Sequence, residues 1–121
     1  MTYQWNDNQP IYWQLRERTI ALILDGTLKE GDPLPSVRHV AAEFQLNPIT
    51  VSKAYQVLVD EQIVEKRRGL GMFVRVSAQK QLLKSERNKF LEDEWPGVLS
   101  RIRQLGLDLE KLIRDSKREK S

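Results

Sequence analysis

The sequence predicts an α+β fold that is mostly helical, and three observations lead to this prediction. Two short helical patterns, each with its own start signal, lie within residues 35–60. Two β-prone runs, residues 63–67 and 72–76, follow and are joined by a turn with two glycines. A longer helical pattern covers most of the remaining chain. A chain of 121 residues with 40% hydrophobic content can bury one modest core. We therefore expect one compact domain at residues 1–77 and a helical segment at residues 78–121.

The chain before the paired helical patterns is expected to form an arm, a helix and a short strand. Residues 1–9 are polar without clear periodicity, which is typical of an arm. Pro10 begins a helix that is expected to end near Asp25. The packing side of this helix is formed by Ile11, Leu15, Thr19, Leu22 and Ile23. The turn-rich segment 29–35 contains two prolines and is expected to supply an edge strand around Leu34.

The paired helical patterns predict a helix-turn-helix. Ser36 is expected to cap the first helix and Asn47 the second. Pro48 then falls at the first helical position, where its missing N–H costs nothing. Each helix has one apolar stripe to bury. The stripes are formed by Val37, Val40, Ala41 and Phe44, and by Val51, Ala54, Tyr55 and Leu58. Two short helices joined by a tight turn make a helix-turn-helix, whose second helix is suited to a DNA groove.

The outward side of the second helix is mostly polar. Thr50, Ser52, Lys53 and Gln56 lie off the apolar stripe, where several of them can reach a base edge or a phosphate. Pro48 and Ile49 differ from them, because neither side chain can hydrogen-bond to a base. Two interpretations of Ile49 therefore stay open: contact with thymine methyl groups, or packing into the domain.

The two β-prone runs predict a hairpin that can serve as a wing. Gly69 and Gly71 supply the positive φ that a tight turn needs, and their lack of side chains lets the backbone approach a phosphate or a groove wall. Arg67 and Arg68 flank that approach. On the turn alone, an ordinary hairpin with a solvated basic turn is the simpler interpretation. The preceding helix-turn-helix favours a wing that contacts DNA.

Five pieces of sequence occur in one order within the first 76 residues: Pro10-Ile-Tyr-x-Gln-Leu15, Gly31-Asp-x-Leu-Pro-Ser-x-Arg38, Asn47-Pro-x-Thr-Val51, Lys53-Ala-Tyr55 and Arg68-Gly-x-Gly-x-Phe-Val74. This series resembles the GntR family of bacterial transcription regulators, and within it the short YtrA-like group. The tail resembles that group in length, in helical character and in Leu105-Gly-Leu107. The resemblance implies a winged helix-turn-helix in a sequence-specific DNA-binding regulator. It also implies repression, and the leading hypothesis is a homodimeric repressor that occludes a promoter at a pseudo-palindromic operator.

The chain departs from this family at two positions near the end of the second paired helix. The family usually has an acidic residue near position 57 and a glycine near position 62, where this chain has Val57 and Gln62. The end of that helix is therefore expected to differ from the family pattern.

The expected DNA contacts come from the start of each paired helix, the outward side of the second helix, and the wing. They are Ser36, Arg38, Asn47, Pro48, Ile49, Thr50, Ser52, Lys53, Arg67, Arg68, Gly69 and Gly71. Arg38 belongs to a piece that matches the family, and we expect it to meet a phosphate or a base. The alternatives are a solvated arginine or an ion pair with Glu43.

Charge is distributed in a way that makes the local clusters more informative than the total. The net charge is +3, but residues 1–77 carry nine Lys/Arg and nine Asp/Glu, and residues 78–121 carry eleven and eight. The excess therefore lies in the tail. The basic groups placed to meet phosphate are Arg38, Lys53, Lys66, Arg67, Arg68 and Arg75.

Several classes of function lack support in the sequence. There is no cysteine, and the one histidine, His39, has only Glu43 nearby in sequence, which is an incomplete metal-ligand set. No nucleophile beside a base and no phosphate-binding glycine loop occurs, so we expect neither an enzyme nor a bound cofactor. No signal peptide or membrane-spanning run is recognisable, and a cytoplasmic protein is expected.

The tail predicts self-association. Its helical pattern runs from Gln79 to Leu105 and continues across Pro96, so we expect one kinked helix there. Gly106 ends this helix and Asp108 caps a last one. Two helices are too few to enclose a ligand, and their apolar face needs a cover, for which a second copy of the chain is the economical choice. The face consists of Leu91, Trp95, Val98, Ile102 and Leu105. A small-molecule effector at the dimer seam is compatible with this arrangement.

A second function stays open at the level of sequence. Winged helices also serve as protein–protein adaptors without DNA binding, and the balanced charge of residues 1–77 is compatible with that use. A salt series distinguishes the two functions, because DNA binding weakens steeply as salt is added and an adaptor has no DNA affinity.

Overall fold

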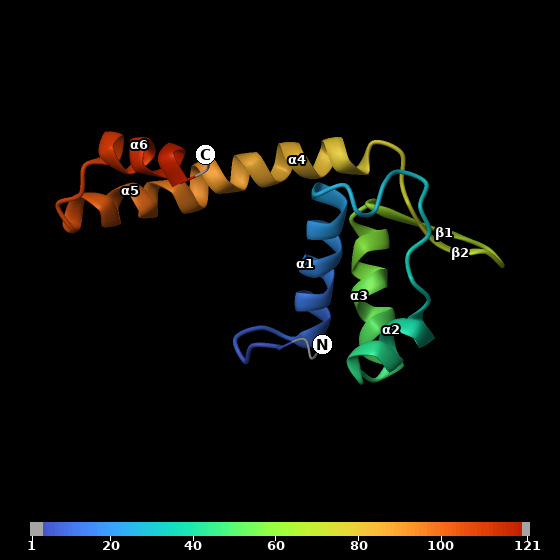
Figure 1. Ribbon diagram of the computed structural model, residues 1–121. Coiled ribbons are helices and arrows are strands. Elements are labelled where there is room, and N and C mark those ends of the chain that lie inside the picture. Colours follow the sequence, from blue (N-terminus) through green and yellow to red (C-terminus); the bar gives the residue numbers. More distant parts are fainter. Residues whose placement is uncertain (1–3, 120–121) are drawn as a thin grey trace. The chain divides into compact units, whose positions relative to one another are not determined.

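The computed structural model describes residues 4–119 and confirms a mostly helical α+β fold (Figure 1). The chain divides between Leu83 and Lys84 into two compact units, which are described separately below. The elements are α1 (Ile11–Leu24), α2 (Val37–Phe44), α3 (Pro48–Asp60), β1 (Val64–Arg67), β2 (Gly71–Val74), α4 (Ala78–Lys89), the π-helical turn η1 (Phe90–Glu94), α5 (Trp95–Gln104) and α6 (Leu109–Glu119).

The predicted helix-turn-helix is present with both predicted caps. Ser36 Oγ accepts a hydrogen bond from the His39 N–H at 3.1 Å, and Asn47 Oδ1 accepts one from the Ile49 N–H at 2.9 Å. Pro48 is the first residue of α3. The end of α2 is a left-handed turn at Gln45, with φ of 55°. Each helix therefore begins at the capping residue that its own sequence supplies.

The core of the first unit lies where α1, α2 and α3 meet the hairpin (Figure 1). The predicted stripe of α3 is entirely buried. In α2 the stripe is buried at Val40 and Ala41 and half-buried at Val37 and Phe44. The largest fully buried side chains are Ile23, Leu58, Val51, Val64 and Val74. These residues come from α1, α3 and both strands, so one core holds the helix-turn-helix and the wing together.

The described part of the predicted arm folds back onto the helices. The Gln14 side chain of α1 accepts a hydrogen bond from the Asn6 N–H and donates to the Asn6 and Gln9 carbonyls, over 2.7 to 3.0 Å. The Trp5 ring meets the Phe44 ring of α2 edge-on at 5.7 Å between centroids. Residues 4–9 are therefore part of the folded unit, and the rest of the predicted arm lies outside the described residues.

The wing is an antiparallel hairpin in which Val64 pairs with Val74 and Arg67 pairs with Gly71. The first strand lies within its predicted run, and β2 begins one residue before the second run and ends two residues earlier. The edge strand expected near Leu34 is reduced to a single bridge between Pro33 and Phe73, because proline cannot extend a hydrogen-bonded ladder. The Leu34 N–H to Met72 carbonyl bond of 2.8 Å adds to this bridge. The segment before α2 is thus tied to the wing.

The end of α3 contains a left-handed turn at Gln62, one of the two positions where the sequence departs from the family pattern. Gln62 has a φ of 63°. The Ile63 N–H donates to the Leu58 carbonyl at 3.0 Å and closes the turn. Residues other than glycine are disfavoured in this conformation, because their Cβ atom crowds the backbone.

Gln62→Gly is therefore expected to raise the free energy of unfolding by about 1 kcal/mol. The matched control is Gln81→Gly, which places the same change inside α4 and should lower stability by about 1 kcal/mol. Chemical denaturation of both variants measures the two effects. A Gln62→Gly protein less stable than the parent would mean that the glutamine side chain stabilises this turn.

The first unit extends beyond the boundary expected at Ser77. Ala78 and Leu82 on the first turns of α4 are buried in its core. The Gln79 side chain donates to the Leu24 carbonyl at 3.3 Å. Glu30 accepts a hydrogen bond from the Ser77 N–H at 2.6 Å. These contacts lie far apart in sequence, which is why the local pattern placed the boundary too early.

The second unit continues from Lys84 through η1, α5 and α6. The kink predicted at Pro96 takes the form of a π-helical turn just before it, in which the Trp95 N–H donates to the Phe90 carbonyl. Such a wide turn makes room for a proline ring and absorbs the missing N–H. Gly106, with φ of 68°, ends α5, and Asp108 Oδ1 accepts a hydrogen bond from the Glu110 N–H at the start of α6. The α6 helix folds back beside α5 (Figure 1).

Candidate nucleic-acid interface

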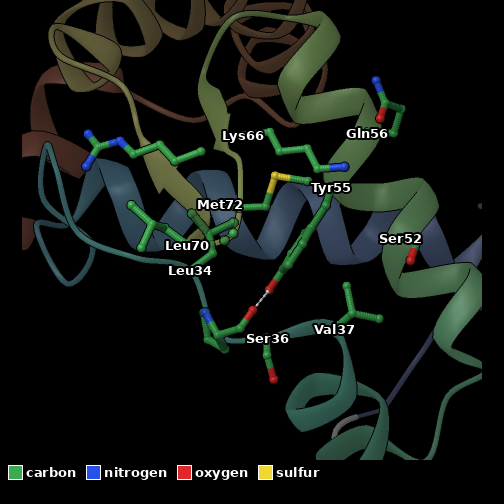
Figure 2. A pocket seen from close by; sticks show the side chains of 13 residues that line it. Leu34, Ser36, Val37, Ser52, Tyr55, Gln56, Lys66, Leu70 and Met72 are labelled. Atoms are coloured by element: carbon green, nitrogen blue, oxygen red, sulfur yellow. Dashed lines mark hydrogen bonds between the residues drawn. The ribbon is translucent and has the colours of Figure 1, made fainter.

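The start of α2, the outward side of α3 and the wing surround one cavity of about 490 Å³ within the first unit (Figure 2). Five of the predicted contact residues line it: Ser36, Ser52, Arg67, Gly69 and Gly71. Gln56 and Lys66, which the sequence marks as an outward polar residue and a basic group placed to meet phosphate, also line it, and so does Leu70, which was not singled out. The cavity brings together polar side chains and glycine backbone from three elements that the sequence separates.

Tyr55 fixes the relative position of two of these elements. Its ring is buried on the core side of α3, and its hydroxyl donates to the Pro35 carbonyl at 2.7 Å (Figure 2). Burial raises the pKa of Tyr55 to about 12, because the phenolate would lose its hydration there. The hydroxyl therefore stays protonated and holds the residue before Ser36 against α3, which places the start of α2 beside the cavity.

The front of α3 is open to solvent. Ile49 is 74% exposed, which rules out the interpretation that it packs into the domain. Pro48 is also exposed, and Thr50 is half-buried. The Asn47 side-chain oxygen is engaged in capping, as described above. The front of the helix therefore offers an apolar tip followed by polar side chains.

Lys53 is exposed and makes a cation–π contact with an aromatic ring. Its Nζ lies 4.2 Å from the centroid of the Tyr12 ring on α1. A cation over an aromatic face is stabilised by about 0.5–1 kcal/mol at an exposed site. Lys53 is not among the residues that line the cavity. Tyr12 was not singled out from the sequence, because no local pattern pairs residues from different helices.

The basic residues of the wing are not equivalent. The Arg67 guanidinium pairs with Glu65 at 3.0 Å and lies 4.2 Å from the Phe73 ring centroid. Arg68 and Lys66 are exposed and have no ion pair with any residue that the structure describes. Arg68 is therefore the arginine of this turn whose charge is free to meet a phosphate.

Arg38 is exposed near the start of α2 and does not pair with Glu43. The partner of Glu43 is instead His39, at 3.6 Å between Nε2 and Oε2. This pair is the incomplete ligand set noted in the sequence, and within residues 4–119 no group of three or more potential metal-ligating side chains occurs. No helix among those residues is long and apolar enough to cross a membrane.

A bidentate ion pair between α1 and the end of α3 stabilises the position of the α3 helix. Arg16 of α1 donates from Nε and Nη2 to the two carboxylate oxygens of Glu61, at 2.6 and 2.5 Å, and also pairs with Glu17. Its guanidinium carbon lies 4.3 Å from the Trp13 ring centroid. Fork-to-carboxylate pairing is geometrically specific. It locks the end of α3 onto α1, and the sequence gives no local sign of it.

Comparison with known proteins connects this geometry to regulators of transcription. A family model described as bacterial regulatory proteins, gntR family, matches residues 11–74. The uncharacterized HTH-type transcriptional regulator YhcF of Bacillus subtilis is 30% identical over 113 residues, which cover 93% of this chain and 92% of that protein. The HTH-type transcriptional repressor YtrA of Bacillus subtilis is 37% identical over 103 residues, covering 85% and 78%. Among solved structures, a GntR family transcriptional regulator from Listeria monocytogenes is similar with a TM-score of 0.75 and 30% identity, covering 94% of this chain and 98% of that one.

Proposed function

Because this chain belongs to the GntR family of bacterial regulatory proteins and is a DNA-binding transcription regulator, we propose that it acts as a homodimeric repressor at a pseudo-palindromic operator. Repression is suggested by the YtrA relative, which carries that description. In this proposal two copies of α3 enter successive major grooves and each wing lies on the adjacent backbone or minor groove. The bound dimer occludes a promoter in the cytoplasm.

The observation that carries the DNA interface is the cavity between α2, α3 and the wing (Figure 2). A DNA strand follows a groove that offers hydroxyls, backbone N–H groups and cationic side chains. Here the hydroxyls come from Ser36 and Ser52, and the backbone N–H groups come from the turn at Gly69. The cationic side chains are Lys66 and Arg67. The exposed front of α3 then reaches base edges while the cavity walls hold the phosphates.

The complete proposed interface is the contact set expected from the sequence together with Lys66, a basic group noted in the sequence that also lines the cavity. Arg38 and Arg68 extend the cationic surface beyond the cavity, and both are exposed. Lys53 contributes from the side of α3 that faces Tyr12. The remaining members are Asn47, Pro48, Ile49, Thr50 and Gly71.

The proposal is tested first at Arg38. Arg38→Ala should weaken operator binding by about 1 to 3 kcal/mol. Thermal stability should stay nearly unchanged, because the Arg38 side chain is exposed and forms no ion pair with any residue that the structure describes. The matched control is Arg87→Ala, an exposed arginine on α4 whose loss should leave affinity within about twofold of the parent. Equal affinities of the two variants would remove Arg38 from the interface.

The wing gives a second test, in the salt dependence of binding. Arg68→Ala should lower affinity for every DNA sequence and reduce the slope of log K against log salt by about 1, since one phosphate contact and its released counterion are lost. Arg67→Ala should change the slope less, because Glu65 already neutralises part of the Arg67 charge. Both slopes come from titrations at several salt concentrations. If Arg68→Ala instead changed the preference for one base, the wing would be reading sequence. A parent protein without DNA affinity at low salt would favour the adaptor function.

A further inference from the structure

The first unit leaves a large apolar side chain at the front of its reading helix. Ile49 is the second residue of α3 and is 74% exposed. Single exposed apolar residues are common on protein surfaces and carry little meaning by themselves. This one is informative because of its position, since the first turn of a recognition helix is the part that meets base edges.

The residues next to Ile49 differ from it in what they can offer to a base. The Asn47 oxygen is occupied, because it accepts the hydrogen bond from the Ile49 N–H at 2.9 Å. Pro48 has no hydrogen-bonding side chain. Thr50 is half-buried behind them. The first residues of α3 therefore present an apolar surface, and the polar side chains that can contact bases lie further along the helix.

We infer that Ile49 determines part of the operator sequence by contacting the 5-methyl group of a thymine in the major groove. This inference rests on the proposed DNA-binding function and specifies one feature of its target. Thymine is the base that presents an apolar group in the major groove. The other bases present donors or acceptors at that edge, and an isoleucine placed against them would remove their water without replacing the hydrogen bonds. Ile49 thus favours thymine and also disfavours the alternatives.

The experiment starts from duplexes that the full-length protein selects from a random DNA library. In the selected half-site each thymine is then replaced singly by uracil, which removes the methyl group and leaves the hydrogen-bonding edge unchanged. At one thymine position the parent protein should lose about fourfold in affinity per half-site, the factor that corresponds to one buried methyl group. Ile49→Ala should bind more weakly than the parent and should show no further loss on uracil at that position.

The control variant is Val76→Ala, which shortens another exposed apolar side chain of the same unit, 77% exposed and lying after β2. It should respond to uracil as the parent does. Two results would overturn the inference and leave the DNA-binding function intact: no thymine whose replacement affects the parent, or an Ile49→Ala protein that still responds at the same position. A parent protein that enriches no sequence at all would remove the proposed operator, and the inference with it. Thermal unfolding confirms that each variant is folded.

Discussion

Leu58→Ala is expected to lower the free energy of unfolding by about 3 kcal/mol, within the range of about 2–5 kcal/mol seen for buried leucines. Leu58 lies on the buried side of α3 and is 0% exposed. Removing its side chain loses the transfer free energy of the removed carbon atoms and leaves a cavity that rigid neighbours cannot close. Its carbonyl also closes the turn at the end of α3, so this part of the core adjoins the link between the recognition helix and the wing.

The matched control is Leu70→Ala, the same chemical change at a residue that is 73% exposed at the tip of the wing. It should change stability by less than about 0.5 kcal/mol. Denaturant unfolding of the two variants and the parent measures both effects, with binding assayed below the midpoint of each. Since small domains are stabilised by only about 5–15 kcal/mol, Leu58→Ala should also reduce the folded, DNA-competent fraction on mild heating. A loss below 1 kcal/mol at Leu58 would show that the site collapses around the gap.

The sequence predicted the helix-turn-helix well because its signals are local. A cap acts on backbone groups two or three residues away, as Ser36 and Asn47 do, and a stripe such as that of α3 repeats within one helix. The hairpin follows equally local rules, since two glycines within one turn set its conformation. These elements needed no knowledge of the rest of the chain.

Features that depend on distant residues could not be predicted in this way. The Arg16–Glu61 pair joins α1 to the end of α3, and the Tyr55 hydroxyl reaches Pro35 across the domain. Burial of Ala78 and Leu82 likewise depends on the core that receives them. Each of these contacts is set by tertiary packing, which sequence periodicity does not report. These tertiary contacts also fix the relative positions of the helices that form the interface. The sequence therefore identified the residues expected to contact DNA, but not the residues that position them.

The left-handed Gln62 shows how tertiary context overrides local preference. Its side chain disfavours positive φ, but the hydrogen bond of Ile63 to Leu58 and the burial of Ile63 and Val64 favour the turn. The cost of the conformation is about 1 kcal/mol, and burying two β-branched side chains outweighs it. The glutamine at this position is therefore expected to cost stability locally, while the turn itself is maintained by the contacts around it.

The second unit has an apolar face without a cover of its own. Among its described residues, 84–118, none has a buried side chain. Leu91, Val98 and Leu105 of the predicted dimerisation face are 58%, 45% and 54% exposed, and Trp95 and Ile102 are half-buried. Trp95 and Ile102 line a groove between α5 and α6, together with Leu112 and Ile113 of α6. Soluble monomers rarely keep so many neighbouring apolar side chains in water, and a two-fold operator needs a two-fold protein.

Val98→Glu combined with Ile102→Glu is therefore expected to convert a dimer into a folded monomer. The two charges would be buried against the partner's apolar face without counter-ions, at a cost of several kcal/mol. Operator affinity should then fall on the order of a hundredfold or more, because the second half-site no longer binds within the same complex. Sedimentation and a titration with the selected operator measure the two effects, which should occur together.

The control is Ser100→Glu combined with Gln104→Glu, which adds the same charge to the same helix at exposed positions on the opposite side of α5. This variant should remain dimeric and bind the operator nearly as the parent does. Truncation is a poorer test if it is made at Ser77, because Ala78 and Leu82 belong to the core of the first unit, so a shortened chain must end after Leu83. If the Val98 and Ile102 variant remained a dimer, the interface would lie in the first unit, and the apolar face of α5 and α6 would have to bind something other than a second copy of the chain.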